Sequence, residues 1–200
     1  MKTSVFTLGH STHKFEHFMH LLETHSITAV ADVRSSPYSR MNPQFNRELL
    51  EQQLSKYGVK YVFLGKELGA RSSDPVCYRD GKVQYELLAQ TESFKSGIER
   101  VLAGSEKFRI ALLCAEKDPL TCHRAILVSR KLEERSLNVE HVLADGRVET
   151  HSEMEERMLE HLNMNTEDMF CTKEQLLDRA YRIQGEAIAY EEQQPAPEPN

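Results

Sequence analysis

The sequence predicts an α/β fold: a Rossmann-like parallel sheet of about five strands with helices on both faces, followed by C-terminal helices. Two features of the sequence carry this prediction. Short apolar runs alternate four times with stretches whose apolar side chains recur every three or four residues, and a fifth apolar run closes the series. Strands and helices that alternate in this way form parallel sheets covered on both faces. Their short crossovers are expected to be right-handed.

The five expected strands are apolar runs bounded by polar or turn-forming residues. They cover residues 5–8, 27–33, 59–64, 108–113 and 139–143. The four helices between them are expected because apolar side chains fall on one helical face. They cover residues 13–22, 45–57, 85–102 and 122–135. Ser11 or Thr12 is expected to cap the first helix, and Gly58 to end the second.

The segment 65–83, between the third strand and the third helix, is long for a connection inside a compact domain. It contains Gly69, Pro75 and an Asp80-Gly81 turn. Connections of this length are often lids or binding loops. We therefore expect a ligand to bind beneath this segment.

Both the charge and the pattern change after the Asp145-Gly146 turn. Residues 151–200 hold 4 Lys and Arg against 12 Asp and Glu, a net charge of -8; the whole chain carries -6, which leaves +2 for the first 150 residues. Amphipathic spacing then predicts two acidic helices, and the last residues are rich in Pro, Gln and Glu, which favours disorder. The predicted divisions are an α/β domain over 1–147, an acidic helical segment over 148–190 with helices at 153–162 and 173–188, and a disordered tail over 191–200.

Composition excludes several classes of protein. No run reaches the roughly 18 apolar residues that a membrane-spanning helix needs, and the first ten residues turn polar too soon for a signal peptide. The four cysteines are too few for a disulfide framework and fit a reducing compartment. We therefore expect a cytoplasmic protein that does not contact membranes.

Reactive side chains gather directly after the fourth strand. Cys114 and Glu116 follow its apolar run, and Cys122, His123 and Arg124 open the next helix. Ligands of open α/β sheets bind at this edge. Because amide groups and positive charge at a helix start lower the pKa of a thiol, Cys122 is predicted to be a nucleophile or a redox thiol. Glu116 and His123 are candidates for proton transfer, and Cys114 is a further catalytic candidate unless its place at the end of a buried strand makes it inert.

Polar side chains also follow the other strands, and in a parallel sheet these strand ends share one edge. The predicted ligand-binding residues, which lie there or in the adjoining loops, are His10, Ser11, Asp32, Arg34, Arg40, Asn46, Glu67, Arg71 and Arg124. Several arginines near one edge suit a carboxylate or phosphate, so the expected ligand is a small anion or a nucleotide. The amide groups of residues 9–12 are either a further anion contact or an ordinary helix cap.

A metal site is the alternative use of the sulfur atoms. Cys114, Cys122 and His123 offer three ligands close together in the sequence. Zinc sites usually combine two closely spaced pairs, and no second pair is present, so Cys77 or Cys171 would have to supply the fourth ligand. We therefore predict no cofactor, and keep a metal bound through these three residues as an alternative.

Five motifs of this chain occur in the same order in a known family. They are Leu8-Gly-His-Ser-Thr12, Asp32-Val-Arg34, the loop from Pro37-x-Ser-Arg40 to Pro43-Gln-Phe-Asn46, Glu67-Leu-Gly69, and Cys114-Ala-Glu-Lys-Asp-Pro-x-x-Cys-His-Arg124. In these motifs the chain resembles, over roughly residues 5–147, the prokaryotic family catalogued as domain of unknown function 488. The resemblance implies a Rossmann-like α/β domain and supplies no reaction. Ala70 stands where the family pattern shows a second glycine after Gly69, which alters any close backbone approach at that position.

The leading hypothesis for function is an enzyme that acts on a small anionic or nucleotide-like substrate with a Cys-His-Arg/Glu site at the C-terminal edge of the strands. Transferase, hydrolase and redox chemistry all fit this set of residues. One alternative is a module without catalysis that binds nucleic acid or a phosphorylated ligand through the same arginines. Another is a protein-interaction module that acts through the acidic C-terminal helices.

Overall fold

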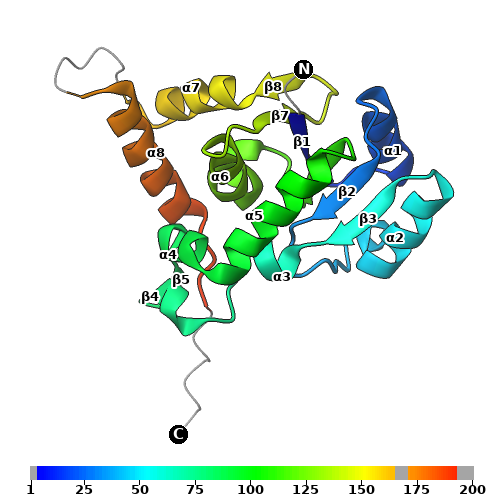
Figure 1. Cartoon of the computed structure of the whole chain (residues 1–200), viewed down its shortest axis with the longest axis horizontal. Helices are drawn as coiled ribbons and strands as arrows, with labels where there is room; N and C mark the ends of the chain where they lie inside the picture. Colours follow the sequence, from blue (N-terminus) through cyan, green and yellow to red (C-terminus); the bar gives the residue numbers. More distant parts are fainter. Residues whose placement is uncertain (1–3, 165–170, 193–200) are drawn as a thin grey trace, which may run out of the picture.

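A computed structural model of the chain confirms the α/β class, with a mostly parallel six-stranded sheet flanked by helices (Figure 1). The structure describes residues 4–164 and 171–192. The order of strands is β3-β2-β6-β1-β7-β8, in which the first five are parallel and β8 runs antiparallel to β7. The strands are β1 (Ser4–Gly9), β2 (Ala29–Asp32), β3 (Lys60–Phe63), β6 (Ile110–Cys114), β7 (Asn138–Val142) and β8 (Val148–Thr150).

The helices divide between the two faces of the sheet. One apolar cluster joins the sheet to α1 and α2, and another joins the opposite face to α3, α5 and α6. Strand β6 shows the alternation behind this: Ala111 and Leu113 face the first cluster, whereas Leu112 and Cys114 face the second. The α-helices are α1 (Phe15–Thr24), α2 (Arg47–Lys56), α3 (Gly65–Leu68), α4 (Tyr85–Gln90), α5 (Glu92–Ser105), α6 (Arg130–Glu133), α7 (His151–His161) and α8 (Lys173–Ile188).

The first helix begins later than the sequence predicts. Its N-cap is Lys14, not Ser11 or Thr12, and no side chain caps it. Ser11 instead lies in a turn with a positive φ of 47°. The expected cap was wrong because the chain must turn tightly at the end of β1 before it can enter the helix.

The helix expected over 85–102 is two helices. The backbone at Thr91 is extended, and the Thr91 side chain accepts a hydrogen bond from the Phe94 amide and so caps α5. Apolar periodicity runs through this point and hides the break, but a capping hydroxyl at the start of α5 stabilises a separate helix.

The helix expected over 122–135 is also irregular. Its first part, η4 (Arg124–Ser129), has π-helical hydrogen bonding, and α6 follows it directly. The Ser129 hydroxyl donates to the carbonyl of Arg124 over 2.7 Å. Single π-helical turns are often found at functional sites. This one directly follows Cys122 and His123 in the chain.

The segment 65–83 is folded against the core and is not an open loop. It contains α3, the short helix η2 (Pro75–Cys77) and a hairpin of β4 (Tyr78–Arg79) and β5 (Lys82–Val83). Cys77 and Val83 are buried in the apolar cluster beside α5. The segment is therefore anchored by apolar contacts, which argues against its predicted role as a lid.

The C-terminal helices pack on the same chain. Met154 and Met158 of α7 and Ala180 of α8 share an apolar cluster with Leu120 and Ile126. Strand β8, which the sequence analysis did not predict, pairs with β7 immediately before α7, so residues 148–150 extend the sheet. Most of the predicted tail, from residue 193 on, lies outside the described residues, but its first two residues pair with the β4–β5 hairpin.

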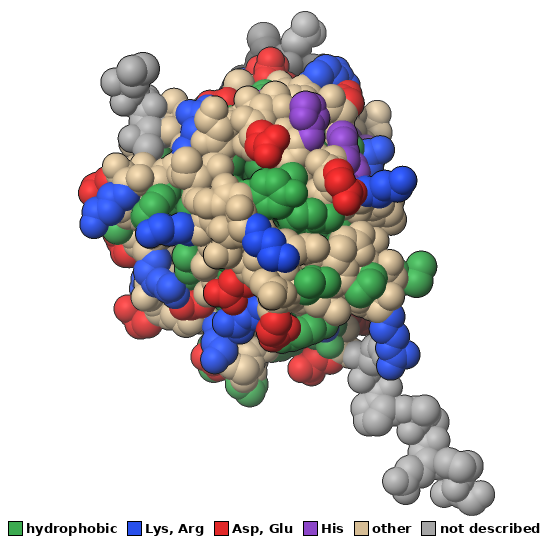
Figure 2. Space-filling view, turned by 90° about the vertical axis from the view of Figure 1, so that its right-hand side faces the viewer, with side chains coloured by type: hydrophobic (Ala, Val, Ile, Leu, Met, Phe, Trp, Pro, Cys, Tyr) green, Lys and Arg blue, Asp and Glu red, His purple; other side chains and the backbone are tan. Residues whose placement is uncertain are grey.

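Acidic and basic side chains are interspersed on the face shown in Figure 2. Within residues 4–164 and 171–192, no helix has the length and apolar character needed to cross a membrane.

Candidate functional site

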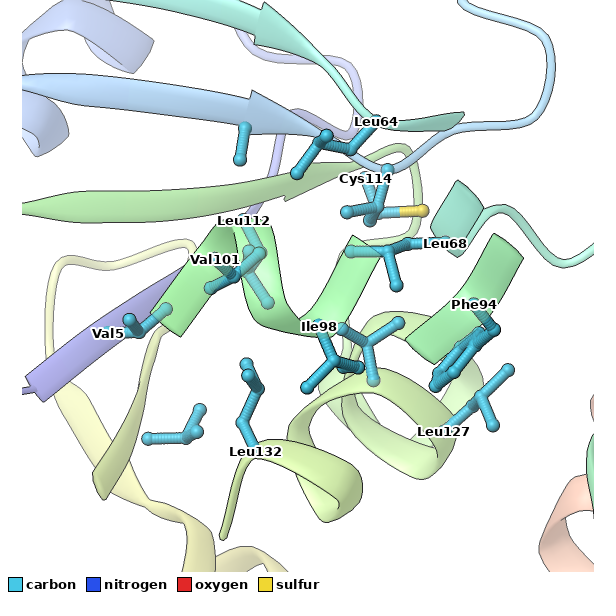
Figure 3. Close-up of a cluster of buried hydrophobic side chains, with 14 of the residues drawn as sticks. Val5, Leu64, Leu68, Phe94, Ile98, Val101, Leu112, Cys114, Leu127 and Leu132 are labelled. Carbon is cyan, nitrogen blue, oxygen red and sulfur yellow. The ribbon is translucent and has the colours of Figure 1, made fainter. Parts of the chain in front are cut away.

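Two thiols and one carboxylate meet at the end of β6. Cys114 is the last residue of this strand, and its side chain points toward the apolar cluster in Figure 3. Cys122 follows the short helix η3 (Pro119–Thr121), whose tight turn returns the chain to the strand end. The two sulfur atoms lie 2.9 Å and 3.0 Å from the same carboxylate oxygen of Glu116. The three residues predicted from the sequence as neighbours are therefore in direct contact.

His123 completes this cluster. Its Nε2 lies 3.0 Å from the carbonyl oxygen of Val33, an acceptor only, so Nε2 carries the proton and donates it. The other ring nitrogen, Nδ1, faces the sulfur atoms of Cys114 and Cys122 over 3.7 Å and 3.9 Å. Both thiols and the imidazole are buried, whereas Glu116 beside them is exposed to solvent. We refer to Cys114, Cys122, His123 and Glu116 as the Cys–His–Glu cluster.

The two thiols differ in acidity although both are buried. Burial opposes ionisation of Cys122, but a hydrogen bond from Cys114 and the positive charge of Arg124 outweigh it and hold the pKa of Cys122 well below its usual range. Burial and the same hydrogen bond raise the pKa of Cys114. Burial and the neighbouring Cys122 raise the pKa of Glu116. Ionisation is thus favoured at Cys122 and opposed at Cys114 and Glu116.

The buried Arg124 side chain stabilises the turn that carries Glu116. It is fully buried, and its guanidinium donates to the carbonyl oxygen of Glu116 over 2.7 Å and to that of Lys117 over 3.3 Å. Its Nε also contacts the Thr7 hydroxyl at 3.4 Å. These contacts fix the 116–117 turn and so hold the Glu116 side chain in reach of the thiols. They describe a structural role, whereas the ligand-binding role expected for Arg124 stays a prediction.

A pocket of about 470 Å³ lies at the same edge of the sheet. It is bounded by three segments that follow β1, β2 and β6, and all but one of its lining residues are polar. Its walls are formed by His10, Ser11, Thr12, Arg34, Ser36, Tyr38, Ser39, Asn42, Ala115, Glu116 and Lys117. Because Glu116 lines the pocket and contacts both thiols, it joins the pocket to the Cys–His–Glu cluster.

Arg34 is held rigidly at the floor of this pocket. It forms a buried ion pair with Asp32 and donates to the carbonyl of Phe45. Its Nη1 lies 3.1 Å from Nε2 of His10, whose Nδ1 donates to the Ser11 carbonyl over 2.9 Å. His10 must therefore be neutral, and burial lowers its pKa to about 4. Four of the five N–H donors of Arg34 are used by these described residues, which leaves one Nη1 donor for a ligand.

The backbone of residues 9–12 offers fewer amide groups than the sequence suggests. The amides of His10 and Ser11 bond to the carbonyls of Cys114 and Ala115, each over 2.9 Å. These two amides are therefore engaged within the chain and do not contribute to anion binding. Ser11 keeps its positive φ inside the pocket wall, and backbone strain of this kind is concentrated at functional sites.

The remaining predicted ligand-binding residues do not line the pocket. Asn46 accepts a hydrogen bond from the Ser39 amide and so shapes the loop that does line it. Glu67 pairs with Arg100, and Arg71 stacks on Tyr190. Arg40 is an exposed residue of the 34–42 loop and is not among the pocket-lining residues. The structure therefore brings together His10, Ser11 and Arg34 with the Cys–His–Glu cluster, whereas Glu67 and Arg71 are not among the pocket-lining residues.

Lys117 and Tyr61 are among the residues of the site that were missed from the sequence. Lys117 lines the pocket beside Glu116, and Tyr61 donates from β3 to the Asp32 carboxylate over 2.7 Å. Lys117 lies within the Cys114–Arg124 motif, so its position next to Glu116 in the sequence could have identified it as a site residue. Tyr61 carried no such signal, because an aromatic residue in a strand is common.

Comparison with known proteins identifies the family. The family model described as "Domain of unknown function DUF488" matches residues 14–131, more than half of the chain. The chain belongs to this family. The DUF488 match includes Arg34 and the whole Cys–His–Glu cluster, whereas His10 and Ser11 precede it. No curated protein and no solved structure matches the chain.

Proposed function

We propose that this DUF488 protein is an enzyme that binds a small anionic or nucleotide-like substrate in the pocket and acts on it with the Cys–His–Glu cluster. The observation that carries this proposal is the position of Glu116. Its carboxylate contacts both buried thiols, and the same residue forms part of the pocket wall. A substrate in the pocket would thus contact Glu116, whose carboxylate in turn contacts both sulfur atoms.

The roles of the cluster follow from its hydrogen bonds. Glu116 is the group placed for proton transfer, because its pKa is raised by burial and it faces the pocket. His123 is less suited to that role, since its Nε2 is engaged with the Val33 carbonyl and its Nδ1 faces the thiols. Cys122, which carries the lower thiol pKa of the two, is the reactive sulfur.

The preference for an anion rests on two cations that line the pocket. Arg34 keeps one N–H donor beyond those used by described residues, and its ion pair with Asp32 holds the guanidinium in place. Lys117 is exposed beside it and can adapt to the ligand. A rigid guanidinium with a mobile ammonium suits a phosphate or carboxylate.

Binding is tested by titration calorimetry of the full chain with inorganic phosphate and with AMP. We expect at least one of the two to bind, and Lys117→Ala to weaken that binding about tenfold, because a hydrogen bond to a charged group contributes about 1.5–3 kcal/mol. Lys107→Ala removes an exposed lysine outside the pocket and serves as the matched control. Equal affinity in the wild type and Lys117→Ala, or no binding of either probe, would contradict the proposed pocket.

Catalysis is tested on whichever probe or related phosphate ester binds. Turnover is measured by chromatography of the products. We expect Cys122→Ser and Glu116→Gln each to abolish turnover, while circular dichroism shows that both variants keep an intact fold. Cys171→Ser, which alters an exposed cysteine, should keep full activity. Undiminished turnover by Cys122→Ser would show that the thiol is not the reactive group.

The protein-interaction alternative has lost its main support. The apolar faces of α7 and α8 are covered by Leu120, Ala125 and Ile126 of the same chain. Nucleic acid binding gains no separate support either, because the pocket-lining residues include only two cations among eleven.

A further inference from the structure

We propose that Cys114, Cys122 and His123 bind one thiophilic divalent cation, with Zn²⁺ as the probe, at a site that opens onto the pocket. The inference deepens the proposed function by naming a cofactor for the same site, and it rests on that function only for the role of the metal. In the metal-bound protein Cys122 acts as a ligand, and the ion replaces the free thiol as the reactive centre. The possible ligand atoms of these three residues all lie within 4.8 Å of one another.

The distances between the ligand atoms fit a zinc tetrahedron. With Zn–S bonds of about 2.3 Å and Zn–N bonds of about 2.0–2.1 Å, tetrahedral angles place sulfur and nitrogen about 3.6 Å apart. Nδ1 of His123 lies 3.7 Å from the sulfur of Cys114 and 3.9 Å from that of Cys122. Both sulfur–nitrogen distances therefore match those of a tetrahedral site to within a few tenths of an ångström.

The orientation of His123 is that of a metal ligand. A histidine that binds a metal through one ring nitrogen almost always donates its other N–H to a carbonyl, a carboxylate or water. Nε2 of His123 donates to the buried Val33 carbonyl over 3.0 Å, and this bond turns Nδ1 toward the two sulfur atoms. The imidazole is thus oriented by a residue outside the cluster, before any ion binds.

The surroundings of the sulfur atoms suit thiolates. The amide of Arg124 points at the sulfur of Cys122 over 3.4 Å, and the buried Arg124 guanidinium carries a positive charge nearby. Two thiolates in an apolar cluster are costly unless a cation neutralises them. A divalent ion balances both charges, and burial of both cysteines keeps water from competing for it.

The fourth position belongs to Glu116 or to the ligand in the pocket. The Glu116 carboxylate lies on the pocket side of both sulfur atoms and contacts each. Cys77 and Cys171 were the expected sources of a fourth ligand, but Cys171 is exposed and Cys77 is outside the group. Three protein ligands with one exchangeable position are typical of catalytic zinc sites. The opening of this site onto the pocket fits that arrangement.

The test uses the full chain after removal of bound metal with a chelator. One equivalent of Zn²⁺ should bind per chain, as measured by elemental analysis after gel filtration. Co²⁺ in its place should give the thiolate-to-metal charge-transfer band and the visible bands of a tetrahedral site. We expect Cys114→Ser, Cys122→Ser and His123→Gln each to weaken Zn²⁺ affinity by about 100-fold or more, because changes to second-shell partners alone cost about 10–100-fold.

Cys77→Ser and Cys171→Ser are the matched controls, and both should keep the wild-type stoichiometry. If a cluster variant does not fold, the Co²⁺ spectrum of the wild type decides, since it reports sulfur ligands directly. Less than a tenth of an equivalent of Zn²⁺ on the wild type, or a Co²⁺ spectrum without thiolate bands, would overturn the inference. Binding of Zn²⁺ without binding of phosphate or AMP would support the metal site and contradict the proposed function. Binding of phosphate or AMP without binding of Zn²⁺ would contradict the metal site and leave the proposed function standing.

Discussion

Gly9 packs directly against the main chain of Glu116 in the site. A Cβ atom at this position would stand 1.8 Å from the carbonyl oxygen of Glu116. That carbonyl accepts a hydrogen bond from the Arg124 guanidinium, so it cannot move away freely. The glycine of the Gly9-His10-Ser11 motif is therefore required by the packing of β1 against the 116–117 turn, and not by contact with an anion.

Replacement of Gly9 by alanine should displace this turn. We expect Gly9→Ala to lower the free energy of unfolding by about 3 kcal/mol, at the upper end of ordinary overpacking, because the clash is with backbone. Urea denaturation measures this loss. Gly104→Ala is the control: its Cβ would meet only the tip of the Ile110 side chain, at 3.0 Å, so stability should change by less than about 1 kcal/mol.

The four cysteines should differ sharply in their reactivity toward alkylating reagents. Cys171 is exposed, whereas Cys77, Cys114 and Cys122 are buried. We expect iodoacetamide to modify Cys171 in the native protein and the other three only after denaturation, as read by peptide mass spectrometry. Rapid native labelling of Cys122 would show that the 115–121 turn opens more readily than the packing of Leu120 and Pro119 suggests.

At the scale of single elements, capping groups and turns decide where helices begin and end. The apolar spacing of residues 85–102 continues across Thr91, but the chain forms two helices because Thr91 is extended and caps the second. The π-helical η4 likewise departs from a regular helix where Ser129 bonds to the Arg124 carbonyl. Periodicity reports which side chains face the core, and hydrogen-bonding side chains set the boundaries.

Loss of the Thr91 hydroxyl should weaken the start of α5. We expect Thr91→Ala to lower the free energy of unfolding by about 1 kcal/mol, as is typical of N-cap losses, and Thr91→Ser to retain most of it. Urea denaturation of the two variants provides the measurement. Equal losses in both would mean that the methyl group of Thr91, and not its hydroxyl, stabilises this junction.

At the scale of the whole molecule, a buried chain of hydrogen bonds connects the site to the C-terminal helices. Each group in this chain donates a hydrogen bond to the next, because the arginine at one end can only donate and the carboxylate at the other end can only accept. The chain passes from Arg124 to Thr7, His141, His151, Tyr181 and Glu155. The links between the two histidines and on to the tyrosine span 3.0 Å and 2.8 Å. Both histidines must be neutral for this order to hold.

Acid should therefore break this connection. Burial and the positive charge of Arg130 lower the pKa of His151 from 6.5 to about 4. Between these pH values the unfolded chain binds a proton that the folded chain does not, so stability is complete above about pH 6.5 and falls as the pH drops to about 4. The expected loss from His151 is on the order of 3 kcal/mol.

The measurement is urea denaturation at several pH values between 7 and 4, with His151→Gln as the test variant. This variant should be less stable at neutral pH and lose less stability on acidification, because glutamine does not titrate. His161→Gln, an exposed position at the other end of α7, should behave like the wild type. A wild-type slope that His151→Gln leaves unchanged would assign the acid sensitivity to other groups.

The sequence alone determined the fold class and the location of the reactive cluster. Five apolar runs mark the five parallel strands, since the burial of a strand is visible in its own residues. Cys114, Glu116, Cys122 and His123 lie within ten residues of chain around a strand end, so local geometry keeps them close. The acidic helices after β8 were equally visible from their apolar spacing.

Only the tertiary structure decided which distant segments meet at that strand end. It placed β6 between β1 and β2, and so brought His10 and Arg34 to the two sides of the cluster. It also assigned the pocket wall to the 34–42 loop, while segment 65–83 packs into the core. Strand order and loop packing depend on contacts between residues far apart in the chain, and periodicity within one segment carries no information about such contacts.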